Sequence, residues 1–354
     1  ETLVCNMEFE FKKITTNENL ERLSELMYLC FGIKVDGSYF QWKYFDNPAG
    51  HVIAYEAVYN GKTVGFYGVI PEFYWVDGKV KKIYQAVEAM THPDFPVFYL
   101  SHIRYLTVDG MSHPDFQKKG LFVSLAQMVT QDALSYDKDQ IMIAIPGSKS
   151  FGKFINKLNW KLMHTCSYTF LPNILFALKN YYRSNSNSCI AKFDEMNSML
   201  LDYLQSIQPH SLVSKVINEE IFKWKIFNNP RFKYKVIGIV KNNELLGICV
   251  YRVDYQNTCL INWLHFKDEM NYKICSPDFF KYIFKETKIR YIYTWKSESK
   301  FLSEAYHKSG FLTNPFKKGP FHSKIPFIIY KQSFDKDSAV ENFDNYDFQP
   351  IMLD

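Results

Sequence analysis

Residues 84–95 read YQAVEAMTHPDF and residues 105–122 read YLTVDGMSHPDFQKKGLF, so nearly the same segment occurs twice, 21 positions apart. Only the second copy continues into QKKG and then into an apolar run that begins at Leu121. This order is typical of a strand, a polar turn, a glycine-containing loop and an amphipathic helix. We therefore expect residues 105–116 to form the strand that leads into the loop. Residues 84–95 are expected to pair beside that strand or to form a flap. The alternative is that the first copy stays in the sheet and the second bulges out.

The loop at residues 117–120 precedes the predicted helix start. Free backbone N–H groups and the helix dipole make such a place suitable for an anion. Gly120 would let a phosphate approach the backbone without a Cβ atom in the way, and Lys118 and Lys119 would add positive charge. The same residues fit an ordinary helix start with two exposed lysines equally well, so both interpretations stay open.

The run HPDFQKKGLF (113–122), directly after VDGM, resembles the acyl-CoA-binding loop of the Gcn5-related N-acetyltransferases (GNATs). That loop has the pattern Gln/Arg-x-x-Gly-x-Gly/Ala, and residues 117–121 match its first five places. Phe122 stands where the family has Gly or Ala. The run IAIPGSKSFGKFINKLNW (143–160) resembles the family's next strand and helix, so the first copy, from about Met7 to Phe176, covers the family's full length.

The resemblance implies direct transfer of an acyl group from acyl-CoA to an amine. The pantetheine arm would lie between two strands, residues 107–111 and 141–145, and a backbone N–H near Met111 would stabilise the oxyanion. Phe154 stands near the place of the tyrosine that acts as the acid in many relatives, so water or Ser148 would protonate the thiolate instead. The expected acyl-CoA-binding residues are Met111, Ser112, Gln117, Lys118, Lys119, Gly120, Leu121, Phe122 and Pro146.

The attacking amine must be neutral, so a base is expected near the thioester. The candidates are Asp109, Glu88, His113 and His92, because the duplicated segment supplies a carboxylate and a histidine twice. We take Asp109, His113 and Glu88 as the candidate catalytic residues. The alternative is structural: the histidine and aspartate of the His-Pro-Asp turn would cap the helix or fix the turn.

A larger repeat divides the chain. Residues 40–65 and 222–247 align without a gap at an offset of 182, and nine positions are identical. Each copy has a helix pattern, an Asn-Pro turn, an apolar strand, a turn with asparagine and a second strand, so helices alternate with strands. The predicted fold class is therefore α/β with a mixed sheet, arranged as two tandem GNAT-like folds. The predicted domains are residues 7–182 and 189–354, joined by the polar run 183–188.

The second copy lacks a Gln-x-x-Gly-x-Gly loop, so it is expected to keep the scaffold without the phosphate site. Such a degenerate twin would pair with the first copy as an intramolecular pseudo-dimer and complete the acceptor pocket. The expected substrate contacts are Trp263, His265, Trp295 and Lys296, which sit where the strands of that copy would end. The alternative for either tryptophan is an ordinary place in the core.

Composition limits the classes of function. The formal net charge is +5 and the Lys and Arg residues are scattered, which favours small anionic ligands over a nucleic-acid surface. The seven cysteines include no C-x-x-C pair, so neither a disulfide framework nor a metal site is expected.

The remaining expectations concern location and the end of the chain. No apolar run approaches the roughly 18 residues of a membrane span, and the start lacks the layout of a signal peptide. We therefore expect a cytoplasmic protein without membrane contact. The tail after Ile329 is acidic and is expected to be a solvated segment.

The sequence thus predicts an acyl-CoA-dependent N-acyltransferase. The long hairpin at residues 65–79 and the degenerate second copy resemble GNATs that acylate nucleotide-linked amino sugars for surface polysaccharide, including lipopolysaccharide. The donor would be acetyl-CoA or a longer acyl-CoA such as a hydroxyacyl-CoA, and the partner a small amino-sugar nucleotide. Two alternatives remain: a tRNA-dependent aminoacyl transferase of the cell-wall type, which would bind no CoA, and a non-catalytic binding protein.

Overall fold

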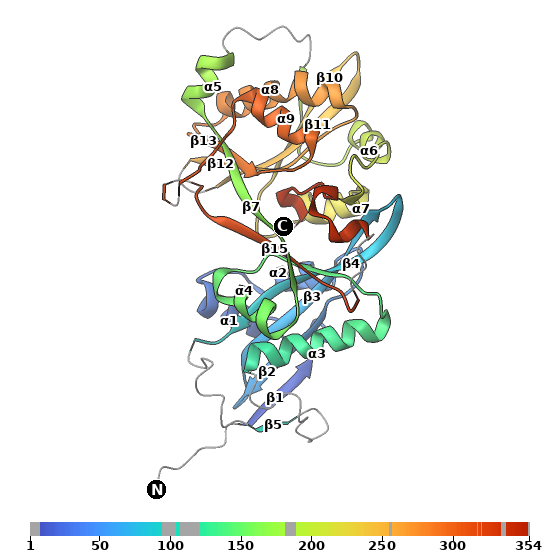
Figure 1. Cartoon of the computed structure of the whole chain (residues 1–354), viewed down its shortest axis with the longest axis vertical. Coiled ribbons are helices and arrows are strands. Elements are labelled where there is room, and N and C mark those ends of the chain that lie inside the picture. The colour runs from blue at the N-terminus through green and yellow to red at the C-terminus, as the bar shows by residue number, and fades with distance from the viewer. Residues whose placement is uncertain are drawn as a thin grey trace. The chain divides into compact units, whose positions relative to one another are not determined.

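The computed structural model of the chain (Figure 1) divides into two compact units. The first contains the described residues of Glu1–Phe73, Lys82–Leu162 and Phe327–Phe334, and the second those of Tyr74–Lys81, Met163–Pro326 and Asp335–Asp354. The structure describes residues 8–93, 104–106, 120–180, 189–254, 257–316, 318–319, 321–333 and 338–352.

The first unit is built on a mixed sheet with the strand order β5-β1-β2-β3-β4-β6-β15. The strands are β1 (Glu8–Lys13), β2 (Ile53–Tyr59), β3 (Lys62–Val76), β4 (Lys79–Thr91), β5 (Arg104–Leu106), β6 (Met142–Ala144) and β15 (Lys324–Tyr330). β4 runs parallel to β6 and β5 parallel to β1, while β2 is antiparallel to both of its neighbours. The helices are α1 (Glu21–Phe31), α2 (Gly37–Tyr44), α3 (Leu121–Tyr136) and α4 (Ser148–Lys157).

The predicted hairpin turns are confirmed. Asn60 and Gly61 between β2 and β3 have φ values of 49° and 73°, and Asp77 and Gly78 between β3 and β4 have 50° and 73°. Two successive residues with positive φ form the turn whose twist matches that of the flanking strands. The second copy repeats this turn with the asparagine pair at 242–243.

The second unit repeats the order of the first, with strands β8-β10-β11-β12-β13-β7. These strands are β7 (Lys161–Pro172), β8 (Cys189–Phe193), β10 (Lys235–Lys241), β11 (Glu244–Asp254), β12 (Thr258–Phe266) and β13 (Tyr291–Trp295). Its helices include α5 (Asn173–Asn180), α6 (Ser198–Gln205), α7 (Glu219–Phe222), α8 (Glu269–Glu286) and α9 (Lys300–Ser309). The two copies differ at one helix end. The first copy ends α2 as an α-helix, whereas Lys223–Phe227 at the corresponding place in the second copy form a π-helical turn. The predicted fold class, two tandem mixed α/β folds, is confirmed.

The last strand of each unit comes from the other sequence copy. β15 lies within the second copy but pairs with β6 of the first, with Ile328 opposite Ala144. β7 lies within the first copy but pairs with β13 of the second, with Leu171 opposite Ile292. The compact units therefore do not have the same limits as the sequence repeats, and the predicted domains stay a prediction about the repeats.

The strand that neighbours β6 is the first copy of the duplicated segment, not the second. Tyr84 and Gln85 of β4 lie opposite Met142 and Ile143, and β15 takes the other side of β6. The start of the second copy, Arg104–Leu106, pairs with β1 instead. The prediction for residues 105–116 was wrong in this respect, because both copies have the same apolar alternation and only their continuity with the loop distinguished them.

The predicted solvated tail is also wrong. Most of the described residues from 338 to 352 are buried in the second unit, although the segment is acidic. The carboxylate of Asp344 faces solvent, while apolar side chains between the acidic positions turn inward. The buried members are Ala339, Val340, Phe343, Tyr346, Phe348, Pro350, Ile351 and Met352.

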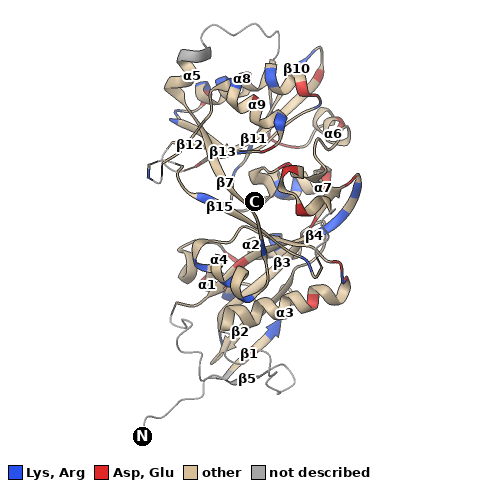
Figure 2. Cartoon of the chain, in the orientation of Figure 1, with Lys and Arg blue, Asp and Glu red and all other residues tan. Residues whose placement is uncertain are grey.

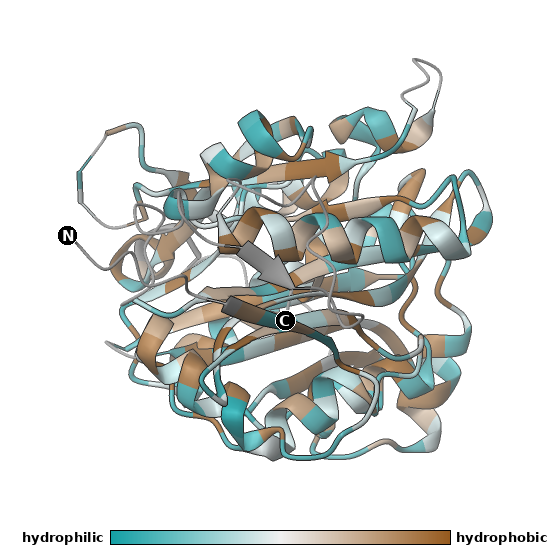
Figure 3. Ribbon diagram, turned by 90° about the horizontal axis from the view of Figure 1, so that it is seen from below, coloured by the Kyte–Doolittle hydropathy of each residue, from teal (hydrophilic) through white to brown (hydrophobic). Residues whose placement is uncertain are grey.

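Each unit has its own hydrophobic core, and Figure 3 shows the apolar residues concentrated on the strands. In the first unit, α3 packs so closely on β3 that Gly65 has no room for a side chain. A Cβ atom there would lie 2.8 Å from Leu121 and 3.0 Å from Leu125, both of which are buried. Gly65 therefore sets how near the first turn of α3 lies to the sheet.

Replacing this glycine tests the contact. Gly65→Ala should lower the free energy of unfolding by about 1–3 kcal/mol, because overpacking a dense core forces side chains or backbone to shift. Gly152→Ala in α4 is the control: its Cβ would meet only Asn156, at 3.9 Å, so stability should stay equal or rise slightly. Urea unfolding of both variants measures the difference, and an unchanged midpoint for Gly65→Ala would contradict the packing.

Candidate functional site

β4 and β6 separate soon after they meet. Their parallel ladder covers only Tyr84 and Gln85 opposite Met142 and Ile143, yet β4 continues to its end at Thr91. Glu88, in the separated stretch, has a φ of 37°, a backbone form that marks a local irregularity in a strand. Strands that separate in this way leave N–H and C=O groups on their facing edges without ladder partners. Such edges can bind an extended polar ligand.

Helix α3 begins close by in the same unit. Gly120 precedes it with φ 87° and ψ 144°, and no side chain of the described residues caps the helix. The first turn contains no acidic residue. The first N–H groups of any helix lack partners within the helix, and the helix dipole attracts negative charge to them. This helix end can therefore hold a phosphate group.

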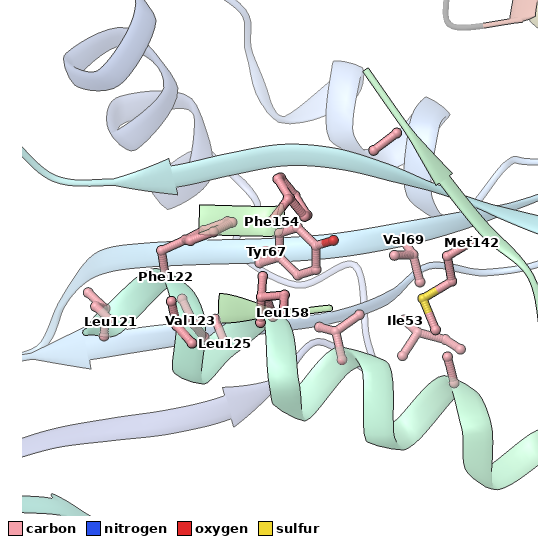
Figure 4. Packing of buried hydrophobic residues seen from close by; sticks show 14 of the residues in the cluster. Ile53, Tyr67, Val69, Leu121, Phe122, Val123, Leu125, Met142, Phe154 and Leu158 are labelled. Carbon is pink, nitrogen blue, oxygen red and sulfur yellow. The ribbon is translucent and has the colours of Figure 1, made fainter. Parts of the chain in front are cut away.

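Phe122 lies in the core and not over the helix end (Figure 4). Its side chain is buried, and its ring centroid lies 5.8 Å from that of Tyr67 and 5.3 Å from that of Phe154, both edge to face. The departure from Gly or Ala at this position therefore does not place a bulky group where a phosphate would approach.

Lys153 is a positive group that sequence reasoning did not find. Its Nζ atom lies 5.4 Å from the centre of the Phe122 ring, at the start of α3. Burial lowers the pKa of Lys153, and no carboxylate among the described residues pairs with it. The lysine belongs to α4, so only the packing of α4 against α3 brings it to the Phe122 ring.

Glu88 is held on both carboxylate oxygens by α2. Its Oε1 accepts hydrogen bonds from Tyr39, at 2.9 Å, and from Lys43, at 2.5 Å, and its Oε2 accepts one from Tyr44, at 2.7 Å. The Lys43 and Glu88 side chains are 12% and 7% exposed. Burial alone would lower the pKa of Lys43, but the Glu88 carboxylate reverses this and the net shift is upward. Burial and the same carboxylate raise the pKa of Tyr44.

These contacts favour a structural role for Glu88. Three side chains of α2 already occupy both oxygens of this carboxylate, so little of its capacity to accept hydrogen bonds is left for a substrate. The network instead fixes β4 to α2 at the irregular residue of the strand. Glu88 as a base stays a prediction that this geometry does not favour.

Several predicted site residues lie outside the described part of the chain. They are Asp109, Met111, Ser112, His113, Gln117, Lys118 and Lys119. Of the others, Gly120, Leu121 and Phe122 come together at the start of α3, and buried Pro146 lies between β6 and α4. Ser148 is the exposed first residue of α4.

The second unit closes the equivalent strand edge with its own tail. β12 and β13 pair only over Thr258–Leu260 and then separate. The Gln349 side chain accepts a hydrogen bond from the Leu264 N–H, at 2.8 Å, and donates one to the Leu264 carbonyl, at 3.4 Å. The Phe348 ring stacks on Trp295 with centroids 4.6 Å apart.

The start of α8 in the second unit is closed as well. The Asp268 side chain accepts a hydrogen bond from the Asn271 N–H, at 2.9 Å, and Glu269 adds a carboxylate in the first turn. A phosphate would meet these negative charges. In the second unit, side chains of the unit itself therefore occupy both the strand edge and the helix end, and the predicted loss of the phosphate site stays a prediction.

The four predicted substrate contacts belong to the second unit. Trp263, His265 and Trp295 are 4%, 4% and 8% exposed. The Tyr203 hydroxyl lies 2.8 Å from Nδ1 of His265, and burial lowers the pKa of His265 to about 3. Lys296 is half exposed and lies 3.6 Å from Glu298. The first three pack as core residues, so their role as acceptor contacts stays a prediction that the burial does not favour.

Comparison with known proteins identifies the fold to which this arrangement belongs. No protein-family model matches the sequence, and no curated protein matches it at a significant level. A tandem GNAT protein from the clavulanic acid biosynthesis pathway superposes with a TM-score of 0.58 at 8% identity, over 93% of this chain and 100% of that one. The chain has the fold of a tandem GNAT protein.

Two further solved structures are similar to this tandem GNAT fold. A probable N-acyltransferase from Enterococcus faecalis has a TM-score of 0.64 at 10% identity, over 91% of this chain and 72% of that one. The N-myristoyltransferase of Saccharomyces cerevisiae with bound myristoyl-CoA has a TM-score of 0.57 at 11% identity, over 93% and 82%. Sequence identity this low supports the fold and leaves activity to be argued from the site.

The described residues also bear on metal binding and membrane insertion. No group of three or more His, Cys, Asp or Glu side chains there could hold a metal ion. Within the same residues, no helix combines the length and apolar character that crossing a membrane requires.

The buried ion pair gives one prediction. Glu88→Gln should lower the free energy of unfolding by about 3–5 kcal/mol, because Lys43 is left buried without a charge partner. Glu10→Gln is the control, since its pair with Lys12 is about half exposed and contributes about 0–1 kcal/mol. Equal unfolding midpoints for the two variants would show that the pair does not fix the strand.

The buried tail gives a second prediction. Phe348→Ala should lower the free energy of unfolding by about 3–5 kcal/mol, the usual result of removing a buried ring. Phe316→Ala, at a ring that is 74% exposed, should change it by less than about 0.5 kcal/mol. Denaturant unfolding followed by tryptophan fluorescence measures both, and a tail that is solvated would leave both variants unchanged.

Proposed function

We propose that the chain is an N-acyltransferase that takes its acyl group from acyl-CoA, with a single donor site in the first unit. One contrast between the described parts of the two units carries this proposal: in the first, no described residue pairs with the separated edges of β4 and β6 or caps the start of α3, and in the second, side chains of the unit itself occupy both places. The fold shared with an N-myristoyltransferase that binds myristoyl-CoA supports it.

The separated edges of β4 and β6 fit one end of acyl-CoA, and the start of α3 fits the other. The pantetheine arm is extended and carries amides, which suits the facing edges of β4 and β6. The diphosphate suits the N–H groups at the start of α3, where Gly120 permits close approach and Lys153 adds charge. Lys118 and Lys119 are proposed to add further charge.

The first copy of the duplicated segment, and not the second, lies beside β6. The residue proposed to stabilise the oxyanion therefore changes as well. At the offset of 21 positions, Met90 of β4 is the counterpart of Met111, so a backbone N–H near Met90 is proposed to stabilise the oxyanion. The amine nitrogen would bond to the thioester carbon, the C–S bond would break, and the amine would lose its surplus proton to a base. Asp109 and His113 remain the proposed bases.

The proposed acceptor is an amino sugar, carried on a nucleotide and used for surface polysaccharide. The net charge of +5 suits a diphosphate-linked acceptor, and Lys and Arg residues are spread over both units in Figure 2. A dedicated polyanion surface would instead gather them on one face. The acyl chain is proposed to be acetyl or a longer group such as hydroxyacyl.

Donor binding tests this proposal. Gly120→Val should abolish acetyl-CoA binding in titration calorimetry, because a branched side chain would block the approach of a phosphate. Gly32→Val is the matched control: Gly32 also has a positive φ, of 68°, at the end of α1, so it shares the backbone strain without the site. Its binding should match that of the wild type.

Three outcomes separate the candidate functions. Binding that only Gly120→Val destroys supports the donor site, and release of thiol with nucleotide-linked amino sugars would then support the acceptor. No binding of acetyl-CoA or of a longer acyl-CoA would contradict the proposal and favour the tRNA-dependent transferase. Binding without thiol release from any amine would favour a non-catalytic protein.

A further inference from the structure

The second unit carries a group of partly exposed aromatic rings on one face of its sheet. Tyr168 and Phe170 belong to β7, and Tyr291 and Tyr293 belong to β13, its neighbour in the sheet (Figure 1). Phe170 lies directly opposite Tyr293, and alternate residues of a strand share a face, so all four side chains point the same way. We call these four residues the aromatic cluster. Each of them is partly exposed to solvent.

The aromatic cluster lies on the face of the sheet that α8 and α9 do not cover. Leu171 and Ile292, which alternate with the cluster residues on the two strands, pack in the core of the second unit together with residues of α8 and α9. Leu312 of β14 (Leu312–Thr313) lies directly opposite Phe170 and is exposed. Apolar side chains that gather at the surface in this way often mark a binding site.

The shared scaffold does not require aromatic residues at this place. β6 holds in the first unit the position that β13 holds in the second, beside a parallel strand on one side and a strand of the other copy on the other. Its residues are Met142, Ile143 and Ala144. The rings are therefore a feature of the second unit that the common fold does not explain.

The ring of Phe321 is stacked on the aromatic cluster. Its centroid lies 4.8 Å from that of Tyr293 and 5.1 Å from that of Phe170, with interplanar angles of 30° and 29°. It also contacts Tyr291 and Tyr168, at 5.9 Å and 6.3 Å between centroids. The near-parallel arrangement on two rings is one in which flat groups attract each other.

The backbone of Phe321 has a conformation that bulky residues rarely adopt. Its φ is 56°, in the left-handed region, and an aromatic residue there is a genuine outlier. Such strain persists only where neighbouring contacts hold it, and it is concentrated at ligand clamps and switch regions. The stacking on the aromatic cluster is a contact that holds Phe321 in place. A flat ligand that stacked in the same position would replace this contact and release the strain.

Two arginine side chains extend from the aromatic cluster. The Tyr293 hydroxyl donates a hydrogen bond to Asp254, and the Arg252 Nε donates one to the same carboxylate, at 2.9 Å. The guanidinium groups of Arg252 and Arg231 lie 4.0 Å and 4.6 Å from the centre of the Phe232 ring. A guanidinium group carries five N–H donors in a planar fork that matches a phosphate group. The group that suits a flat ring and the group that suits a phosphate are therefore neighbours.

We propose that the second unit binds a free nucleotide here, with the base in the position of the Phe321 ring and the phosphate groups at Arg252 and Arg231. Every base has a flat face that stacks on aromatic side chains, and phosphate forms strong charge-assisted hydrogen bonds with arginine. A strand of RNA would need a longer basic stripe, whereas the Lys and Arg residues are scattered. The inference goes beyond the proposed function and stands without it, since all of its residues belong to the second unit.

Titration calorimetry with UDP and GDP, a pyrimidine and a purine nucleotide, tests the ligand. Neither has the pantetheine arm that the proposed donor site would hold. Each should bind at least about tenfold more tightly than its nucleoside, which lacks phosphate, and than inorganic pyrophosphate, which lacks a base. A short oligouridylate should bind no more tightly than UDP.

Four variants test the position of the ligand. Phe321→Ala should raise the affinity for both nucleotides about tenfold, because the base no longer competes with a stacked ring. Phe316→Ala is its control, at a ring in the same loop that is 74% exposed, and should change nothing. Arg231→Gln should lower the affinity about tenfold, the usual result of losing a charge-assisted hydrogen bond. Lys308→Gln, on α9 at the other face of the sheet, should leave it unchanged.

Each other result would overturn the inference. A wild type and a Phe321→Ala variant that bind neither nucleotide would exclude the site, and equal binding of pyrophosphate would reduce it to a charged surface. Nucleotide binding that no variant changes would place the ligand elsewhere, and tighter binding of the oligouridylate would assign the surface to RNA. Arg231 is exposed, so its variant decides the matter if Phe321→Ala does not fold. Acetyl-CoA binding should be equal in all variants, so failure here leaves the proposed function intact.

Discussion

Parallel strands that separate leave backbone donors and acceptors that must find partners elsewhere, and this constraint shapes both units of the protein. In the first unit β4 leaves β6 after two pairs, and in the second β12 leaves β13 after three. A sheet tolerates such an opening only if something else bonds to the exposed edges. The second unit solves the problem internally, with the amide of Gln349 bonded to both backbone groups of Leu264.

The helix ends beside the two openings differ in charge. α8 begins with the carboxylates of Asp268 and Glu269, while α3 begins at Gly120 with no acidic residue in its first turn. Because a helix start attracts negative charge, α8 satisfies this attraction with its own side chains, whereas no carboxylate in the first turn of α3 does so. In the proposed function, this difference leaves the start of α3 to the diphosphate of acyl-CoA.

Local patterns predicted much of this from the sequence. The repeat, the hairpin turns with asparagine and glycine, and the helix that starts after Gly120 all depend on neighbouring residues, and each is confirmed. The choice between the two copies of the duplicated segment was wrong, because their apolar alternation is the same and strand pairing is decided by distant partners. The burial of the tail was missed because its acidic residues conceal a run of aromatic and aliphatic positions that face inward.

The site depends still more on contacts that sequence cannot supply. Lys153 approaches α3 only through the packing of α4, and Phe122 leaves the helix end free only because Tyr67 and Phe154 receive its ring. Phe321 meets the four rings of the aromatic cluster only because β7 and β13, which are far apart in the sequence, are neighbours in the sheet. Conversely, the duplicated carboxylate at Glu88 looked catalytic from its place in the motif, and its three hydrogen-bond donors from α2 indicate a structural role.

The exchange of last strands has a consequence for how the protein is made. β6 has β4 on one side and β15 on the other, so the sheet of the first unit is finished by a segment synthesised after nearly all of the second copy. Until Lys324–Tyr330 has left the ribosome, β6 presents a bare edge to other nascent chains. Contacts between such distant segments also form slowly. The two copies therefore mature together, and neither sequence repeat can be inherited, expressed or lost as a self-sufficient module.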